Sequence, residues 1–120
     1  KGQIAGWGNT LAKENNNPGN LKFAGQPNSE KGRGGFAKFK DANTGFRALI
    51  KQIQLDTSRD MDIQKFITKY SPPNENDTKK YLKFLTDNLG VKPTTKLSET
   101  SPYNLAKQVA MFESQTKIED

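Results

Sequence analysis

Apolar residues recur at helical spacing throughout the second half of the chain. Four segments show this pattern, and each is bounded by residue types that begin or end helices. We therefore predict helices over about residues 42–57, 63–70, 76–89 and 102–115. The predicted N-caps are Asp41 or Asn43, Asp60 or Asp62, Asn76 or Asp77, and Ser101 followed by Pro102. Pro72-Pro73 and Gly90 are expected to end the second and third of these helices.

The first forty residues follow a different pattern. Residues 1–10 carry a few apolar side chains interrupted by Gly6 and Gly8, and we predict a short helix there. Residues 20–24 and 35–39 resemble short strands, and the second alternates apolar and other side chains. They predict a small β-hairpin whose polar loop, residues 25–34, is mobile.

A polar turn precedes this hairpin. Residues 15–23 read Asn-Asn-Asn-Pro-Gly-Asn-Leu-Lys-Phe, which cannot form the interior of a helix. Such a turn either presents amides and backbone groups in a cleft or is a plain surface turn.

Together these elements predict an α+β fold that is mainly helical. At 120 residues the chain is expected to form one domain, residues 1–120. Its parts would be a first helix and turn (1–14), the asparagine turn with the hairpin (15–40), a helical lobe (41–115) and a frayed tail (116–120). No apolar run is long enough to span a bilayer.

The chain contains neither histidine nor cysteine. This composition removes the usual zinc sites, cysteine nucleophiles, serine–histidine triads and disulfide bonds. We expect no metal and no cofactor. Acid–base chemistry near neutral pH therefore has to come from carboxyl groups.

Basic residues exceed acidic ones, 19 against 13, which gives a net charge of +6. Such a surface favours polyanions, including nucleic acid, anionic lipid and the acidic polymers of a cell wall. The basic residues are spread along the chain, and no RNA-binding motif is present. Binding of nucleic acid driven by this charge is therefore a weaker hypothesis.

Two carboxyl groups stand out as candidate acids. Glu14 precedes the asparagine turn, where Trp7 and Phe23 could desolvate it and raise its pKa, or it is an exposed turn residue. Glu75 lies between two helices and could face a cleft or interact with a helix dipole. The other carboxyl groups are interpreted as helix caps, a loop residue, or solvated and tail positions, the last group being Asp56, Asp87, Glu99, Glu113, Glu119 and Asp120.

Several segments resemble one family. Residues 15–21 (Asn-Asn-Asn-Pro-Gly-Asn-Leu), residues 35–39 (Gly-Phe-Ala-Lys-Phe), Gly45 with Ala48-Leu49, and residues 69–82 (Lys-Tyr-Ser-Pro-Pro-Asn-Glu-Asn-Asp-Thr-Lys-Lys-Tyr-Leu) carry the resemblance. They are similar to phage and prophage lysozyme-like domains of the soluble lytic transglycosylase type. The resemblance covers residues 4 to about 91.

The resemblance implies a lysozyme-type fold in which a glutamate at the end of the first helix faces a small sheet across a groove. That glutamate protonates the bond between N-acetylmuramic acid and N-acetylglucosamine, and then acts as a base while an anhydro ring closes. In active relatives the triplet Glu-Gly-Trp precedes the asparagine turn, whereas this chain has Ala5-Gly6-Trp7. Either the chain is catalytically inactive, by engineering or by descent, or Glu14 or Glu75 is the acid.

The resemblance therefore implies a peptidoglycan-cleaving glycosidase, a lytic transglycosylase or muramidase, acting at the bacterial cell wall or periplasm during infection or lysis. Its partner would be peptidoglycan glycan strands, and the isolated domain is expected to be a monomer. The alternative is a non-catalytic virion or peptidoglycan-binding module with the same fold. The candidate substrate-binding residues are Trp7, Asn17, Asn20, Phe36, Tyr70, Asn76 and Tyr81.

Overall fold

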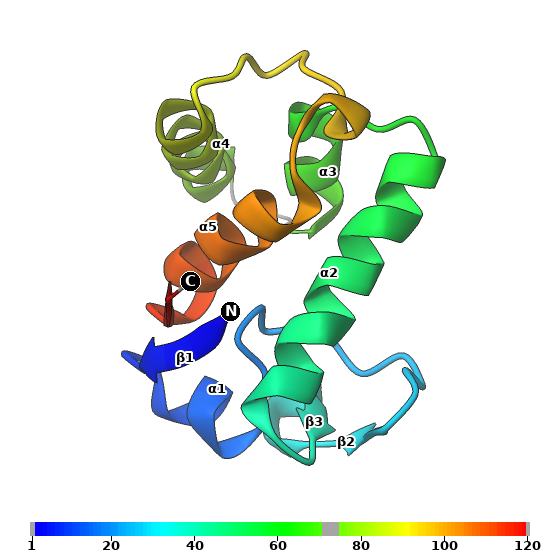
Figure 1. Ribbon diagram of the computed structural model, residues 1–120, viewed down its shortest axis with the longest axis vertical. Coiled ribbons are helices and arrows are strands. Elements are labelled where there is room, and N and C mark those ends of the chain that lie inside the picture. Colours follow the sequence, from blue (N-terminus) through cyan, green and yellow to red (C-terminus); the bar gives the residue numbers. More distant parts are fainter. Residues whose placement is uncertain (1, 71–74, 120) are drawn as a thin grey trace.

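The computed structural model describes residues 2–70 and 75–119, without the side chains of residues 75 and 76. Five α-helices account for most of the regular structure (Figure 1). They are α1 (Thr10–Glu14), α2 (Ala42–Ser58), α3 (Ile63–Tyr70), α4 (Glu75–Leu89) and α5 (Pro102–Ser114). Two short 3₁₀ turns, η1 (Arg33–Gly35) and η2 (Leu97–Glu99), lie between them.

Four short strands form two separate antiparallel pairs. β1 (Gln3–Gly6) pairs with β4 (Lys117–Glu119), which joins the two ends of the chain. β2 (Ser29–Lys31) pairs with β3 (Ala37–Phe39). The fold is therefore α+β and mainly helical, as the sequence predicted.

The four helices predicted in the second half of the chain are confirmed, and so are several of their boundaries, while the predicted stop at Pro72-Pro73 lies outside the described residues. Asp41 accepts a hydrogen bond from the Thr44 backbone N–H at the start of α2, and Asp62 does the same for Lys65 in α3. The Ser101 hydroxyl likewise accepts the N–H at the third position of α5. Gly90 follows α4 with a φ of 67°, a conformation that favours glycine.

Three predictions near the chain ends and the hairpin are wrong. Residues 3–6 form a strand and not a helix, and the tail is not frayed because residues 117–119 pair with that strand. The partner of residues 37–39 is the segment 29–31, which was expected to be mobile loop. Residues 20–24 form no regular strand, but they do lie antiparallel to the predicted partner segment. The contacts are a bridge between Lys22 and Phe36 and backbone hydrogen bonds from Phe23 to Gly35 and from Ala37 to Leu21.

The core lies where the four longer helices meet. Its fully buried side chains come from α2, α3, α4 and α5 and from β3, with Leu21 from the asparagine turn. Figure 1 shows α3 and α4 at one end of the molecule and α1, β2 and β3 at the other, with α2 and α5 running between them. Among the described residues, no helix is both long and apolar enough to cross a membrane.

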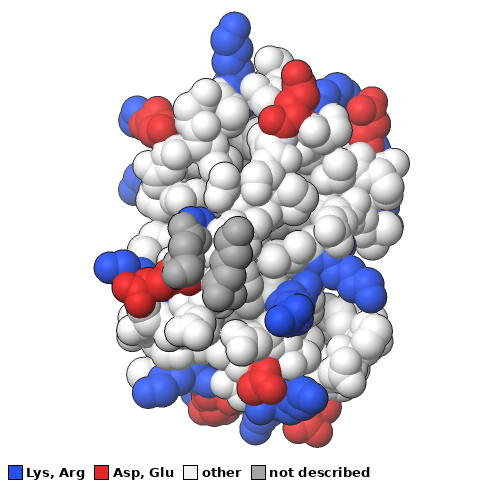
Figure 2. All heavy atoms as spheres, viewed as in Figure 1, with Lys and Arg blue, Asp and Glu red and all other residues white. Residues whose placement is uncertain are grey.

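Figure 2 shows how the charged side chains are distributed on one face of the molecule. On the face shown in Figure 2, Lys and Arg side chains are spread out and mixed with Asp and Glu side chains. This face therefore lacks the continuous basic patch that binding of nucleic acid favours.

Candidate functional site

The asparagine turn packs tightly between α2 and α5. Asn16 and Asn20 both have a φ of 50°, which asparagine tolerates better than most residues. Gly45 lets α2 approach the turn, since a Cβ there would lie 1.9 Å from the Asn16 carbonyl oxygen. A Cβ on Gly19 would lie 2.7 Å from the Tyr70 hydroxyl. The two motifs of the resemblance are therefore in contact at this turn.

Asn17 holds the turn together and is not available to a ligand. Its side chain is fully buried. Its amide donates to the Leu21 and Ala37 carbonyl oxygens, at 2.9 Å each, and its oxygen accepts the Leu21 N–H. The prediction that Asn17 binds substrate is therefore not supported by its position, which gives it a structural role.

Asn20 reaches from the turn to the end of α5. Its Nδ2 donates to the backbone oxygen of Glu113 at 3.1 Å. The Ser114 hydroxyl lies 2.6 Å from the Pro18 carbonyl oxygen, to which it donates. These bonds join residues more than ninety positions apart and place the last turn of α5 against the asparagine turn.

Glu113 is the carboxyl group that this arrangement brings into the site. Its side chain is partly buried, and burial raises the pKa to about 7, against the lowering effects of Tyr81 and Asn20. Near neutral pH it therefore populates both the acid and the base form, as a general acid–base catalyst requires. The interpretation of Glu113 as a solvated position was wrong because α5 packs its last turn against the asparagine turn and α4.

Two tyrosines surround this carboxyl group. The Tyr81 ring is buried and stacks on Phe112, with their centroids 4.0 Å apart. Its hydroxyl influences the pKa of Glu113 but, among the described residues, has no partner at full hydrogen-bond geometry. The Tyr70 hydroxyl donates to the Gly19 carbonyl oxygen at 2.5 Å. Burial, and then the Glu113 charge, raise the pKa of both tyrosines, so both hydroxyls stay protonated.

Of the two acids predicted from the sequence, the structure describes the side chain of Glu14 alone. Glu14 is exposed on α1, where the Arg33 side chain donates to it at 3.0 Å and lowers its pKa. The expected desolvation by Trp7 and Phe23 is therefore wrong, and Glu14 stays ionised near neutral pH. Glu75 is the first residue of α4, and its side chain lies outside the described residues.

Position 5, where the resemblance places the acid, lies in the β1–β4 pair. Ala5 is exposed, at the point where the register of the two strands shifts.

Trp7 is partly buried between β1 and α1, and Phe36 is partly buried beside the hairpin. The Asn76 side chain lies outside the described residues. Of the predicted substrate-binding residues, the structure brings Asn20, Tyr70 and Tyr81 together.

Glu113 carries a sequence signal that the prediction passed over. It lies eight positions after Leu105 and four after Val109, so it continues the buried side of α5. Asp56 lies seven positions after Leu49 and three after Ile53, so it also continues an apolar stripe, on α2. It is buried, 1% exposed, although it was expected to be solvated. At both positions, a carboxyl group in line with the apolar residues of a helix therefore indicated that the side chain would be at least partly buried.

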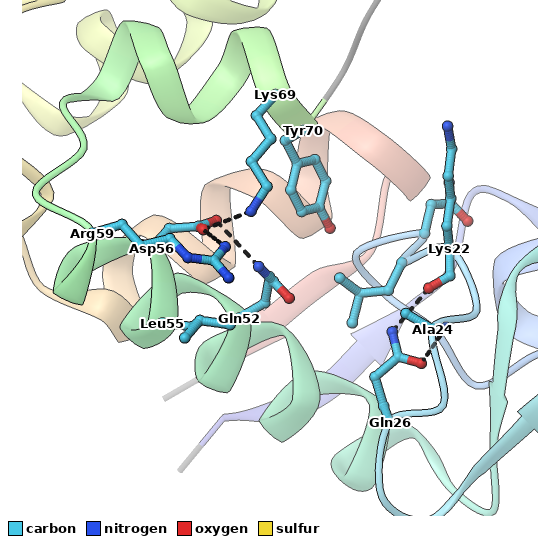
Figure 3. A pocket seen from close by; sticks show the side chains of 11 residues that line it. Lys22, Ala24, Gln26, Gln52, Leu55, Asp56, Arg59, Lys69 and Tyr70 are labelled. Carbon is cyan, nitrogen blue, oxygen red and sulfur yellow. Dashed lines mark hydrogen bonds and ion pairs between the residues drawn. The ribbon is translucent and has the colours of Figure 1, made fainter.

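Asp56 forms a second charged cluster, on the other side of Tyr70. Its carboxylate pairs with Lys69 at 2.7 Å and Arg59 at 3.1 Å, and the Gln52 amide donates to it (Figure 3). A cavity of about 300 Å³ lies over this cluster and is also lined by Asn20 and Tyr70. Asn20 and Tyr70 thus separate a half-buried acid from a basic cavity.

No cluster of three or more acidic, histidine or cysteine side chains suited to a metal ion occurs within the described ranges 2–70 and 75–119. The chain matches no protein-family model, and the search of curated proteins returned no significant match. The site is therefore interpreted from its own residues: one half-buried carboxyl group, two protonated tyrosines and an asparagine amide.

Proposed function

We propose that this chain is a peptidoglycan-cleaving glycosidase domain of the lytic transglycosylase type, with Glu113 as its general acid and base. The observation that carries this proposal is the half-buried Glu113 carboxyl group, whose pKa burial raises to about 7. In a chain without histidine, it is the group best suited to exchange a proton near neutral pH.

The position of Glu113 in the fold also supports the proposal. The resemblance rests mainly on two segments, residues 15–21 and 69–82, that are far apart in the sequence. Asn20 from the first segment and Tyr81 from the second both act on Glu113. The resemblance implies a glutamate at the end of the first helix. Glu14 has that place in the chain but is exposed and paired with Arg33, so we assign the role to Glu113 at the end of α5.

The proposed reaction needs one carboxyl group. Protonated Glu113 donates its proton to the glycosidic oxygen as the bond from C1 of N-acetylmuramic acid to that oxygen breaks. The resulting carboxylate accepts the proton of the 6-hydroxyl group of the same sugar while O6 forms a bond to C1. The products are a 1,6-anhydro end and a free 4-hydroxyl group, and Glu113 returns to its acid form.

The surroundings of Glu113 favour this route over hydrolysis with two carboxyl groups. No other carboxyl group contributes to the pKa of Glu113 within the described part of the chain. The negative charge of Asp56 is balanced by its ion pairs with Lys69 and Arg59. A retaining or inverting hydrolase places a second carboxyl group at a defined distance from the first.

The alternative of a non-catalytic binding module rested on Ala5. Because Ala5 lies on an exposed strand and Glu113 has the properties of the missing acid, alanine at position 5 does not require an inactive domain. We therefore retain this alternative only as an outcome of the test.

The test is mass spectrometry of purified peptidoglycan treated with the unmodified chain, Glu113→Gln and the control Glu14→Gln. We expect 1,6-anhydromuramyl fragments from the unmodified chain and from Glu14→Gln, with a rate about 10² to 10⁴ lower for Glu113→Gln. Reducing ends in place of anhydro ends would make the domain a muramidase. Retention on peptidoglycan without fragments from any variant would identify a binding module.

A further inference from the structure

The cavity over Asp56 continues into a second one. The second cavity, of about 470 Å³, lies between α2 and the segment 26–28. Gln26, Gln52 and Leu55 line both cavities, so the two form one trough that begins at Asn20 and Tyr70. We call this combined space the basic trough.

One wall of the basic trough is a single face of α2. Its residues follow helical spacing of three and four positions and are Thr44, Arg47, Ala48, Lys51, Gln52, Leu55 and Arg59. The opposite wall is the segment 22–28, held in shape by Gln26. The Gln26 Nε2 donates to the Lys22 carbonyl oxygen at 2.8 Å, and its Oε1 accepts the Ala24 N–H. Both walls are therefore formed before any ligand binds.

The charge of the trough is strongly positive. Its lining includes one carboxylate, Asp56, and six basic side chains: Lys22, Lys40, Arg47, Lys51, Arg59 and Lys69. Asp56 holds Arg59 and Lys69 in place, while Lys22 and Lys51 pair with no acidic side chain among the described residues. Hydrogen bonds from Thr44, and then the charges of Lys40 and Arg47, lower the pKa of the nearby Asp41.

The trough also has apolar and amide surfaces between these charges. Leu55 is 45% exposed although it is a large apolar side chain. Figure 3 shows the Gln52 amide oxygen on the side away from Asp56, directed toward the opposite wall. Alternating cations, an exposed leucine and an amide acceptor suit a short peptide that carries carboxylates and methyl groups.

We propose that the basic trough binds the carboxylate-bearing stem peptide of the peptidoglycan strand whose glycan lies at Glu113. This inference rests on the proposed function. Stem peptides leave the glycan at the lactyl group of N-acetylmuramic acid and carry free carboxylates and alanine methyl groups. Because the trough begins at Asn20 and Tyr70, which contact the Glu113 region, a peptide attached to a bound sugar has a direct path into it.

The stem peptide fits the trough better than a phosphate-rich wall polymer does. A polyphosphate chain would use the six cations but not the exposed Leu55 or the Gln52 oxygen. A peptide uses all three, since its backbone N–H groups donate to an amide oxygen and its methyl groups cover leucine.

The variant that tests this proposal is Lys22→Gln/Lys51→Gln, which removes one unpaired cation from each cavity. The control is Lys83→Gln/Lys92→Gln, which removes the same charge from exposed positions outside the trough. Each protein is assayed on peptidoglycan and on glycan strands from which an amidase has removed the stem peptides. Thermal unfolding of each variant confirms that the fold is retained.

We expect the unmodified chain and the control to have a KM about tenfold lower for peptide-bearing strands, as two charge contacts of modest strength would give. The trough variant should lose this preference while keeping its activity on peptide-free strands. An equal loss on both substrates, or no change on either, would overturn the proposal.

Binding separates this inference from the proposed function. A soluble stem tripeptide is titrated calorimetrically into Glu113→Gln, with and without the two trough substitutions. Binding lost only in the trough variant supports the inference even if no chain proves catalytic. The protein's retention on cell walls could instead depend on the phosphate-rich wall polymer and disappear when that polymer is stripped from the walls. This result would assign the trough to the polymer and contradict the inference.

Discussion

Replacing Glu113 by glutamine is expected to stabilise the fold at alkaline pH while slowing the proposed reaction. Glutamine keeps the shape of the side chain and removes its charge. The folded protein holds the carboxyl group partly buried, with a pKa of about 7 against an ordinary value of 4.5. As pH rises, the unfolded chain therefore releases this proton before the folded protein does. The unfolding free energy of the unmodified chain consequently falls between about pH 4.5 and pH 7.

The size of the effect follows from this difference in pKa. By linkage, it corresponds to roughly 3 kcal/mol of unfolding free energy above pH 7, an upper value because the side chain is only partly buried. That amount is a large share of the stability of a small domain. At pH 8, Glu113→Gln should gain up to this amount over the unmodified chain, and at pH 4 the two should be nearly equal.

Urea unfolding of both proteins at several pH values between 4 and 8 measures the difference. Since the chain has no histidine, few other groups titrate near pH 7, and their effects cancel in the comparison of the two proteins. Glu30→Gln, at an exposed strand position, serves as the control and should leave the pH profile unchanged. If the gap between the unmodified chain and Glu113→Gln is the same at pH 4 and pH 8, the carboxyl group is not desolvated and the reasoning fails.

Three further predictions follow from the site. Activity should fall as pH rises above about 7, because the acid form of Glu113 is lost. A pH profile of kcat/KM measures this, and an activity that rises through this range would contradict the prediction. Tyr81→Phe should move that alkaline limb upward, since the hydroxyl lowers the pKa of Glu113, and an unchanged limb would show that the two groups do not interact. Asn17→Ala should lower the unfolding free energy by about 3 kcal/mol through loss of buried hydrogen bonds, measured by urea unfolding, and a loss below 1 kcal/mol would contradict its structural role.

The helices could be predicted because their information is local. A stripe of apolar residues and a capping side chain specify a helix within a dozen positions, as Asp41 and the apolar face of α2 illustrate. The strand pair β1–β4 depends instead on segments separated by more than one hundred positions. Neither Gln3–Gly6 nor Lys117–Glu119 shows an alternating pattern long enough to reveal that pairing.

Glu113, which we propose as the acid, was missed for a related reason. The resemblance directed attention to the residues just before the asparagine turn, where a glutamate would precede it in the chain. Glu14 does precede the turn, but it is exposed and paired with Arg33, whereas α5 brings Glu113 to the turn from a distant part of the sequence. The local signal at Glu113, a carboxyl group on the stripe begun by Leu105 and Val109, was visible, but Glu113 was interpreted as a solvated or tail position.

The pairing of the chain ends explains how a residue so near the C-terminus can be held in a defined site. Ser114, directly after Glu113, and Thr116, three positions after it, are both fully buried, and the Ser114 hydroxyl bonds to the asparagine turn. Gln115 then turns the chain with a φ of 48°, so that β4 runs along β1. Because both sides of Glu113 are fixed in this way, its carboxyl group stays in the partly buried position that raises its pKa. The segment expected to be a frayed tail is therefore part of what holds the acid in place.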